Sequence, residues 1–172
     1  IIDGHSSIGG APQDKKTALS QSELIIGENN HIREFVTINR GANTTRVGDN
    51  NWLMAYSHVA HDCVIGDGCT FSNGATLGGH VQVGDDVIFG GLCAVHQWCR
   101  IGNGSMIAGG SMVVQDVPPF CIAQGDRATL AGLNRVGLRR KEIKSTEIDA
   151  LHSAYCAVFN SCLLYTSPSP RD

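Results

Sequence analysis

Large apolar residues recur at every sixth position along the middle of this chain. Twelve consecutive positions spaced six apart hold such a residue, and glycine often follows it directly, as at Gly48, Gly66 and Gly84. A period of six fits neither the 3.6-residue repeat of a helix nor the alternation of a half-buried strand. It is typical of a chain that winds around a triangular prism with one short strand and one turn per hexad. The anchors are Val47, Leu53, Val59, Ile65, Phe71, Leu77, Val83, Phe89, Val95, Ile101, Ile107 and Val113.

Three hexads make one coil of the prism, so residue n should lie beside residue n+18. Residues 47–118 then form four coils, each rising by roughly 4.8 Å as parallel strands do. Ile26, Ile32 and Ile38 keep the same step before a loop, "NRGANTTR" (39–46), interrupts it. The pattern predicts an all-β parallel β-helix over residues 1–128.

The hexad count ends after the pair of prolines at 118–119, and the sequence then predicts helices over 129–140 and 145–159. Thr146 and Asp149 have the spacing of a helix-capping pair. The second helix carries an apolar stripe typical of core packing, formed by Ile148, Leu151, Tyr155, Val158 and Phe159. Residues 129–159 are therefore interpreted as the start of a C-terminal helical domain. The tail from 160 to 172, "NSCLLYTSPSPRD", fits neither pattern and is predicted to be non-native.

Composition excludes several classes of function. The formal net charge of −3 provides no basic field for nucleic acid, and no apolar run is long enough for a membrane span. Seven cysteines without CxxC spacing do not form a disulfide framework, so we expect a reducing, cytoplasmic location. Four of them, at 63, 69, 93 and 99, occupy the small-residue position of the hexad and are predicted to be buried packing residues.

Stacking by 18 residues gathers histidines on one edge of the prism. Gly79 should lie over His61, His80 over Asp62, and Trp98 over His80. Four of the seven histidines belong to this edge, and His96 takes a slot that glycine usually fills. The predicted cluster comprises His58, His61, Asp62, Gly79, His80, His96 and Gln97.

This set of residues suits proton transfer coupled to acyl transfer. A histidine can accept a proton near neutral pH, an adjacent carboxylate can orient it, and a glycine N–H can stabilise an oxyanion. No GxSxG nucleophile motif is present, which favours direct transfer to a hydroxyl. The alternative use of histidines is a zinc site like that of the γ-class carbonic anhydrases, but the spacings 58/61, 80 and 96 do not match that pattern. We therefore expect no metal.

Four segments carry a family resemblance: "HVAHDCVIGDGC", "ATLGGHVQVGDDVIFGG", "AVHQWC" and "VVQDVPPFCIAQGDRATLAGLNRVGLRR". The chain resembles the UDP-N-acetylglucosamine 3-O-acyltransferases of lipid A synthesis from about residue 3 to 159. The resemblance implies a left-handed β-helix, a homotrimer with sites between subunits, and no cofactor. The donor would be a 3-hydroxyacyl thioester on the phosphopantetheine of acyl carrier protein. It also implies that the chain is truncated at both ends.

The resemblance also implies roles for single residues. His61 would be the general base, Asp62 its orienting partner, and Gly79 the oxyanion donor. Lys141 stands where the family often has a second arginine, and Val136 replaces a carboxylate expected near uracil. The implied contacts to sugar, acyl-pantetheine or diphosphate are Asp14, Lys16, His58, His80, His96, Gln97, Asn134 and Arg140.

Gly109 resembles a family position that limits the length of the acyl chain, where glycine admits long chains of the 3-hydroxymyristoyl class. The alternative is a glycine that the backbone shape requires. Two other functions also stay open: an acetyl-CoA-dependent O-acetyltransferase on the same fold, and a β-helix fragment that keeps the site without activity. The acceptor position, 3-hydroxyl or 3-amino, is likewise left open.

Overall fold

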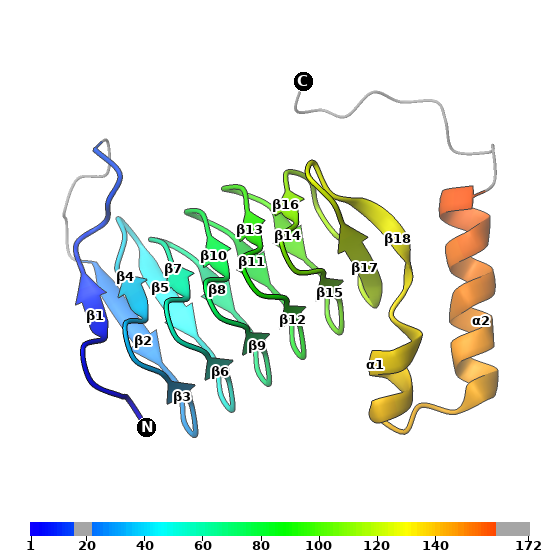
Figure 1. Cartoon of the computed structure of the whole chain (residues 1–172), viewed down its shortest axis with the longest axis horizontal. Coiled ribbons are helices and arrows are strands. Elements are labelled where there is room, and N and C mark those ends of the chain that lie inside the picture. Colours follow the sequence, from blue (N-terminus) through cyan, green and yellow to red (C-terminus); the bar gives the residue numbers. More distant parts are fainter. Residues whose placement is uncertain (16–21, 161–172) are drawn as a thin grey trace.

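The chain forms a three-sided solenoid that ends in two helices (Figure 1). This computed structural model describes residues 1–15 and 22–160. Each coil contributes one short strand to each of three sheets, and each sheet runs along the solenoid axis. Parallel strands stacked in this way bury one face of every sheet against the other two.

Within residues 1–15 and 22–160, the three sheets contain six, five and seven strands. The six-stranded sheet consists of β1 (Ser7–Gly10), β4 (Thr37–Asn39), β7 (His58–Val59), β10 (Thr76–Leu77), β13 (Ala94–Val95) and β16 (Met112–Val113). The five-stranded sheet consists of β2 (Glu23–Ile26), β5 (Thr44–Val47), β8 (Val64–Ile65), β11 (Gln82–Val83) and β14 (Arg100–Ile101). The seven-stranded sheet consists of β3 (His31–Ile32), β6 (Trp52–Leu53), β9 (Thr70–Phe71), β12 (Ile88–Phe89), β15 (Met106–Ile107), β17 (Cys121–Gln124) and β18 (Thr129–Leu133).

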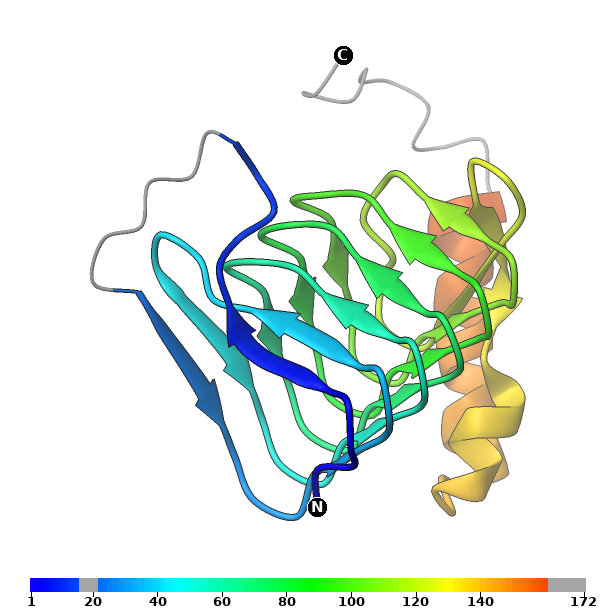
Figure 2. The ribbon, with the colours of Figure 1, turned by 60° about the vertical axis from the view of Figure 1, so that its left-hand side comes forward.

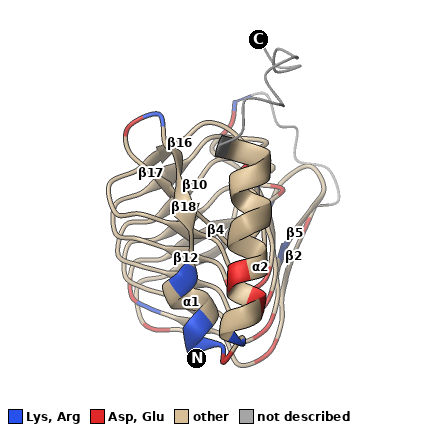
Figure 3. Ribbon diagram, turned by 90° about the vertical axis from the view of Figure 1, so that its right-hand side faces the viewer, with Lys and Arg blue, Asp and Glu red and all other residues tan. Residues whose placement is uncertain are grey.

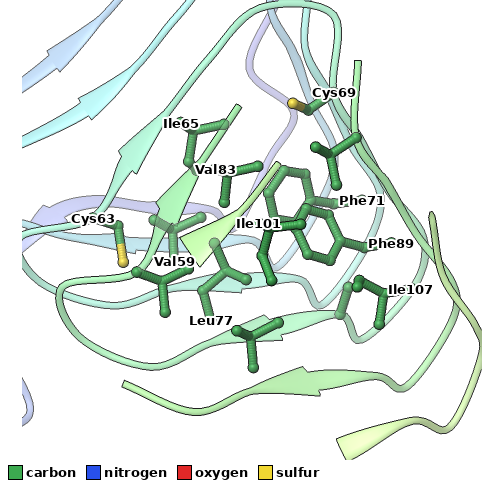
Figure 4. Close-up of a cluster of buried hydrophobic side chains, with 14 of the residues drawn as sticks. Val59, Cys63, Ile65, Cys69, Phe71, Leu77, Val83, Phe89, Ile101 and Ile107 are labelled. Carbon is green, nitrogen blue, oxygen red and sulfur yellow. The ribbon is translucent and has the colours of Figure 1, made fainter. Parts of the chain in front are cut away.

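Strand pairing confirms the predicted register of 18 residues. Val59 pairs with Leu77 and Leu77 with Val95, all in parallel. Every anchor of the hexad series is buried, at 5% exposure or less. Figure 4 shows anchors of the three sheets meeting inside the prism, where the rings of Phe71 and Phe89 stack with centroids 4.5 Å apart.

The cysteines inside the solenoid pack as predicted. Cys63, Cys69, Cys93 and Cys99 are each at most 1% exposed, and the described cysteines form no disulfide with one another. Burial raises the pKa of the Cys63 and Cys69 thiols to about 12 and that of Cys93 to about 11. Because the thiolate is the reactive form, these cysteines are packing residues rather than nucleophiles.

Polar side chains form a ladder along the corner between the five- and seven-stranded sheets. The backbone N–H of Asp49 donates to Oδ1 of Asp67 at 2.7 Å, and the N–H of Asp67 donates to Oδ1 of Asp85 at 2.9 Å. Asn103 continues the series by accepting from Asp85 at 3.2 Å. Each coil is thereby joined to the next by a side chain as well as by strand pairing.

The C-terminal segment differs from the prediction in two respects. Residues 129–133 form strand β18, antiparallel to β17, so the predicted helix over 129–140 is wrong in its first half. Helix α1 spans Arg135–Arg140, and the predicted second helix is confirmed as α2 (Ser145–Tyr155), which continues into the π-helical turn η1 (Cys156–Asn160). Gly132 adopts a φ of 136°, which suits a distorted strand and not a helix.

The predicted capping pair of Thr146 and Asp149 is also wrong. The N-cap of α2 is Lys144, which makes no side-chain capping hydrogen bond. Oδ1 of Asp149 instead accepts from Arg135 at 2.8 Å, which joins the two helices. Within the apolar stripe, Ile148 is buried and Phe159 remains 45% exposed.

None of the helices in the described residues combines the length and apolar character needed to cross a bilayer.

Candidate active site

The candidate site lies at the corner where the six-stranded sheet turns into the five-stranded sheet. The three stacked turns at this corner, at 60–63, 78–81 and 96–99, carry the predicted histidine cluster. The connection at 40–43 leaves the solenoid at the same corner in an earlier coil, and Figure 2 shows it in line with the later turns. The fold therefore places this loop and the histidine cluster on one edge.

A buried hydrogen bond between neighbouring side chains forms the centre of the site. Nδ1 of His61 lies 2.8 Å from Oδ2 of Asp62, and both residues are less than 9% exposed. An ionised carboxylate can only accept hydrogen bonds, so Nδ1 carries the proton and Nε2 keeps the lone pair. This tautomer is the one required of a histidine that accepts a proton through Nε2.

The Asp62 carboxyl is strongly held in its ionised form. Burial alone would raise its pKa, but the hydrogen bond from His61 and those from the backbone N–H groups of Asn43 and Ala42 outweigh burial and lower it. Asn43 donates to Oδ1 at 2.6 Å and Ala42 to Oδ2 at 3.2 Å. Asp62 therefore remains an anion throughout the neutral range.

Gly79 lies directly over the ring of His61, as the stacking predicted. A Cβ atom added to Gly79 would lie 2.6 Å from both Cε1 and Nε2 of His61. Only a glycine allows the backbone to come this close to the imidazole. The basic nitrogen of His61 and the turn of Gly79 thus belong to one small volume.

His80 and Trp98 extend the site along the corner. Nε2 of His80 lies 3.7 Å from Oδ2 of Asp62, and its ring meets the ring of His61 edge-on. Burial lowers the pKa of His80, against the opposing effect of the Asp62 charge. The indole of Trp98 covers the outer face of His80. The predicted order Asp62, His80, Trp98 is confirmed.

The remaining predicted neighbours are also present at this edge. His58 is the first residue of β7, and its Nδ1 lies 2.6 Å from Oγ1 of Thr37. Burial and, to a smaller extent, the nearby charge of His61 lower its pKa. His96 and Gln97 are exposed in the third turn. Asp14 is exposed a few residues after β1, and its charge acts on His80. Lys16 lies outside the described residues.

Three predicted site residues do not share this corner. Gly109 lies at the corner between the seven- and six-stranded sheets, beside Gly91. Asn134 and Arg140 belong to the α1 region beyond the last coils, which carries a group of basic side chains (Figure 3). Within one chain, these residues and His61 do not form a single site.

Asn134 has a structural role in this fold. It is buried, its Oδ1 accepts from the N–H of Gly137 at 3.0 Å, and its Nδ2 donates to the carbonyl of Gly104 at 3.0 Å. It therefore caps α1 and ties the helix to the solenoid. Lys141 pairs with Asp86, whereas Arg140 is exposed. The predicted nucleotide contacts of Asn134 and Arg140 stay predictions.

His61, Asp62 and His80 together could offer one ligand atom each to a metal ion, since these atoms lie within 4.8 Å of one another. The carboxylate, however, already accepts a ring N–H of His61 and two backbone N–H groups. Those donors direct positive charge at the position where a cation would bind. The arrangement is better suited to orienting a histidine than to coordinating a metal.

Sequence reasoning missed the contacts of the loop at 40–43 with Asp62. Backbone N–H groups leave no residue-type signal, and only the glycine at 41 marks the close approach.

Comparison with known proteins places the chain in a family. The model of the family described as "Udp N-acetylglucosamine O-acyltransferase; Domain 2" matches residues 116–167, and the model of bacterial transferase hexapeptide repeats matches residues 44–79. A curated acyl-carrier-protein-dependent UDP-N-acetylglucosamine O-acyltransferase of Aliarcobacter butzleri is 52% identical over 162 residues. That match covers 92% of this chain and 62% of the relative, so the chain spans less than two thirds of the relative's length.

Solved structures agree with this match. The LpxA structure of Acinetobacter baumannii superposes with a TM-score of 0.91 at 40% identity, covering 94% of this chain and 64% of that one. The LpxA structure of Bacteroides fragilis, described as a UDP-N-acetylglucosamine acyltransferase, has a TM-score of 0.91 at 37% identity and covers 98% and 71%. The predicted left-handed parallel β-helix of hexapeptide repeats is confirmed. The chain belongs to the UDP-N-acetylglucosamine O-acyltransferase family.

Proposed function

We propose that the protein transfers a 3-hydroxyacyl chain from acyl carrier protein to the 3-hydroxyl of UDP-N-acetylglucosamine, the first step of lipid A synthesis. The observation that carries the proposal is the buried contact of 2.8 Å between His61 and Asp62, which leaves Nε2 of His61 as a base. The family membership, with relatives named for this reaction, supplies the substrates.

In the proposed mechanism, Nε2 of His61 removes the proton of the sugar 3-hydroxyl as its oxygen attacks the thioester carbonyl. Asp62 stabilises the imidazolium that forms. The N–H of Gly79 stabilises the oxyanion of the tetrahedral intermediate. The C–S bond then breaks, and the proton on His61 passes to the departing phosphopantetheine thiolate. No cofactor and no metal ion takes part.

The other residues at this corner would bind the substrates. His58, His80, His96 and Gln97 line the edge around His61, and Asp14 and Lys16 would reach the sugar and acyl group from the segment that follows β1. Arg140 would pair with the diphosphate, since a guanidinium binds phosphate oxygens strongly. Because the α1 region and Gly109 do not share the corner of His61, a complete site would need residues from a second chain.

We therefore propose a homotrimer with sites between subunits. A second observation supports association: large apolar side chains stand exposed on the corner between the seven- and six-stranded sheets. The rings of Phe35 and Tyr56 stack there with centroids 5.1 Å apart, and Leu92 is 73% exposed in a later coil. A row of this kind is typical of a surface that another chain covers. We place the enzyme in the cytoplasm, where its thiols stay reduced.

The test is acylation of UDP-N-acetylglucosamine by the purified protein with 3-hydroxymyristoyl donors. We expect product with the carrier-protein thioester and little with acyl- or acetyl-CoA. The rate with the carrier-protein thioester should be the same with and without a chelator. Product from acetyl-CoA alone would support the O-acetyltransferase alternative, and loss on chelation with recovery on adding zinc would support a metal site. A monomer on light scattering, without activity, would favour an inactive fragment. A 3-amino sugar nucleotide as competing acceptor decides between ester and amide formation.

A further inference from the structure

The loop that interrupts the hexad repeat closes over Asp62. The step from the anchor Ile38 to the anchor Val47 is nine positions, whereas the step from Val59 to Ile65 in the next coil is six. The extra residues lie between β4 and β5, at the corner of the candidate site (Figure 2). The loop that interrupts the repeat is therefore the segment that contacts the Asp62 carboxylate.

Three hydrogen bonds join this loop to Asp62. The consecutive N–H groups of Ala42 and Asn43 donate to its two carboxylate oxygens, at 3.2 and 2.6 Å. Oγ1 of Thr45 accepts from the Asp62 N–H at 2.8 Å, and Thr45 has no exposed surface. Successive backbone N–H groups that converge on an anion form a nest, which holds negative charge by fixed dipoles.

Gly41 makes this approach possible. A Cβ atom at this position would lie 2.2 Å from Cγ and Oδ2 of Asp62. Any other residue would have to move the loop or the carboxylate. The loop can therefore lie close enough for both N–H groups to reach the carboxylate only if residue 41 is a glycine.

We propose that Gly41 and Thr45 are positioning residues that form, with the backbone of 42–43, a cradle for the Asp62 carboxylate. The cradle donates one backbone N–H to each oxygen of the carboxylate. Oδ2 of Asp62 is thereby directed at Nδ1 of His61, and the lone pair of that ring is confined to Nε2. The catalytic part of this inference rests on the proposed function, whereas the placement of the carboxylate and tautomer does not.

The first test measures the site without any reaction. In Gly41→Ala, the added methyl group displaces the loop, and we expect ¹³C NMR to show the Asp62 carboxyl titrating at higher pH than in the wild type. We expect ¹⁵N NMR to show His61 changing from a single Nδ1–H tautomer to a mixture. Thr45→Val, which keeps the shape and removes the acceptor, should change both signals in the same direction to a smaller extent.

Gly91→Ala is the matched control. Its Cβ would meet only the carbonyl of Asn73, at 3.5 Å, in a turn at another corner. Both NMR signals should stay as in the wild type. A folded Gly41→Ala protein with an unchanged Asp62 titration and an unchanged His61 tautomer would overturn the proposal.

A second pair of variants covers the case in which Gly41→Ala does not fold. Asp62→Gly removes the atoms that the new methyl group would strike, and glycine suits the φ of 59° at that position. Gly41→Ala/Asp62→Gly should therefore melt at the same temperature as Asp62→Gly alone. If the double variant unfolds while Asp62→Gly folds, the methyl group at position 41 clashes with atoms other than the Asp62 carboxylate, and the proposal is wrong.

Kinetics form the last arm. If the enzyme is active as proposed, Gly41→Ala should lower kcat on the order of 10²-fold, the cost typical of a misplaced catalytic group, with little change in KM for the sugar nucleotide. An unchanged kcat in a protein whose NMR signals have moved would overturn the catalytic part. Absence of wild-type activity would count against the proposed function, while the NMR arm would still decide the placement.

Discussion

The imidazole of His80 lies parallel to the indole of Trp98, with ring centroids 3.7 Å apart and planes inclined by 3°. The two residues are separated by one coil. Nε2 of His80 lies 3.7 Å from Oδ2 of Asp62. Trp98 is 57% exposed. Because the two rings are in contact, the fluorescence of Trp98 should depend on the charge of His80.

We predict a fluorescence titration of Trp98 in a Trp52→Phe background, which removes the tryptophan beside His31. Emission should fall as pH falls through the pKa of His80, because a protonated imidazole quenches a stacked indole. The midpoint should lie below the ordinary histidine value of about 6.5, since burial lowers it. Asp62→Asn should move the midpoint to still lower pH, and His80→Asn should abolish the transition. A transition that persists in His80→Asn would assign it to another group.

His61→Gln tests the proposed base. Glutamine keeps a polar side chain of similar reach but cannot accept the substrate proton, so kcat should fall by about 10²–10⁴-fold. The measurement is steady-state acylation, with circular dichroism to verify the fold. Turnover near the wild-type rate in folded protein would exclude His61 as the base.

Gly79→Ala separates the position of the His61 ring from the oxyanion donor. Alanine retains the backbone N–H, but its methyl group would overlap Nε2 of His61. We therefore expect a fall in kcat of about 10²-fold, as for other misplaced groups. The reference is the wild-type protein, with circular dichroism to verify that the variant is folded. A wild-type rate in the folded variant would show that the ring tolerates displacement.

His58 predicts a loss of stability in mild acid. Because burial holds its pKa below the ordinary value, the unfolded chain binds a proton more readily than the folded chain as pH falls below about 6.5. The free energy of unfolding should therefore decrease between pH 7 and 5.5. We expect Tm to drop on the order of a few degrees, and less in His58→Gln than in the wild type. His152→Gln, on the exposed side of α2, should retain the full drop. A drop of the same size in His58→Gln would assign it to other groups.

Gly109→Met tests the proposed limit on acyl length. Gly109 does not have a positive φ, whereas Gly110 has one of 68°, so the backbone requirement applies to Gly110. A Cβ at 109 would meet only backbone atoms of Gly91, its carbonyl oxygen at 3.3 Å and its nitrogen at 3.8 Å. We expect the variant to fold and to prefer shorter donors than the 3-hydroxymyristoyl class in a competition among carrier-protein thioesters. An unchanged length profile would remove Gly109 from this role.

The repeat could be derived from sequence because one rule acts at every coil. Burying one apolar side chain per hexad fixes the strand, the turn and the register together, so the contact of Gly79 with His61 followed from counting alone. Residues 129–133 lie outside that rule. Their composition suits a helix, but the exposed edge of β17 offers hydrogen bonds that an antiparallel strand satisfies, and this tertiary pairing overrides local preference.

The candidate site divides in the same way. His61, Asp62, His80 and Trp98 were predictable as a stack because each occupies a repeat position. The cradle at 41–45 was not, since its donors are backbone groups that every residue carries. The capping role of Asn134 could not be predicted for a related reason. The side-chain amide is hydrogen-bonded to the backbone of Gly104 and Gly137, and the sequence does not show that these groups lie close to it.

The side-chain ladder of Asp49, Asp67, Asp85 and Asn103 repeats one kind of contact between coils every 18 residues. Each of these coils is attached to the next by the same strand pairing and by a backbone N–H donated to an aspartate or asparagine Oδ1, so a whole coil can be deleted or duplicated while this type of junction is kept. The separation between the His61 corner and the basic end at α1 can then vary only in complete steps of one strand spacing, roughly 4.8 Å. Evolution and protein engineering can therefore set the reach of this scaffold in discrete units, by adding or removing 18 residues at a time.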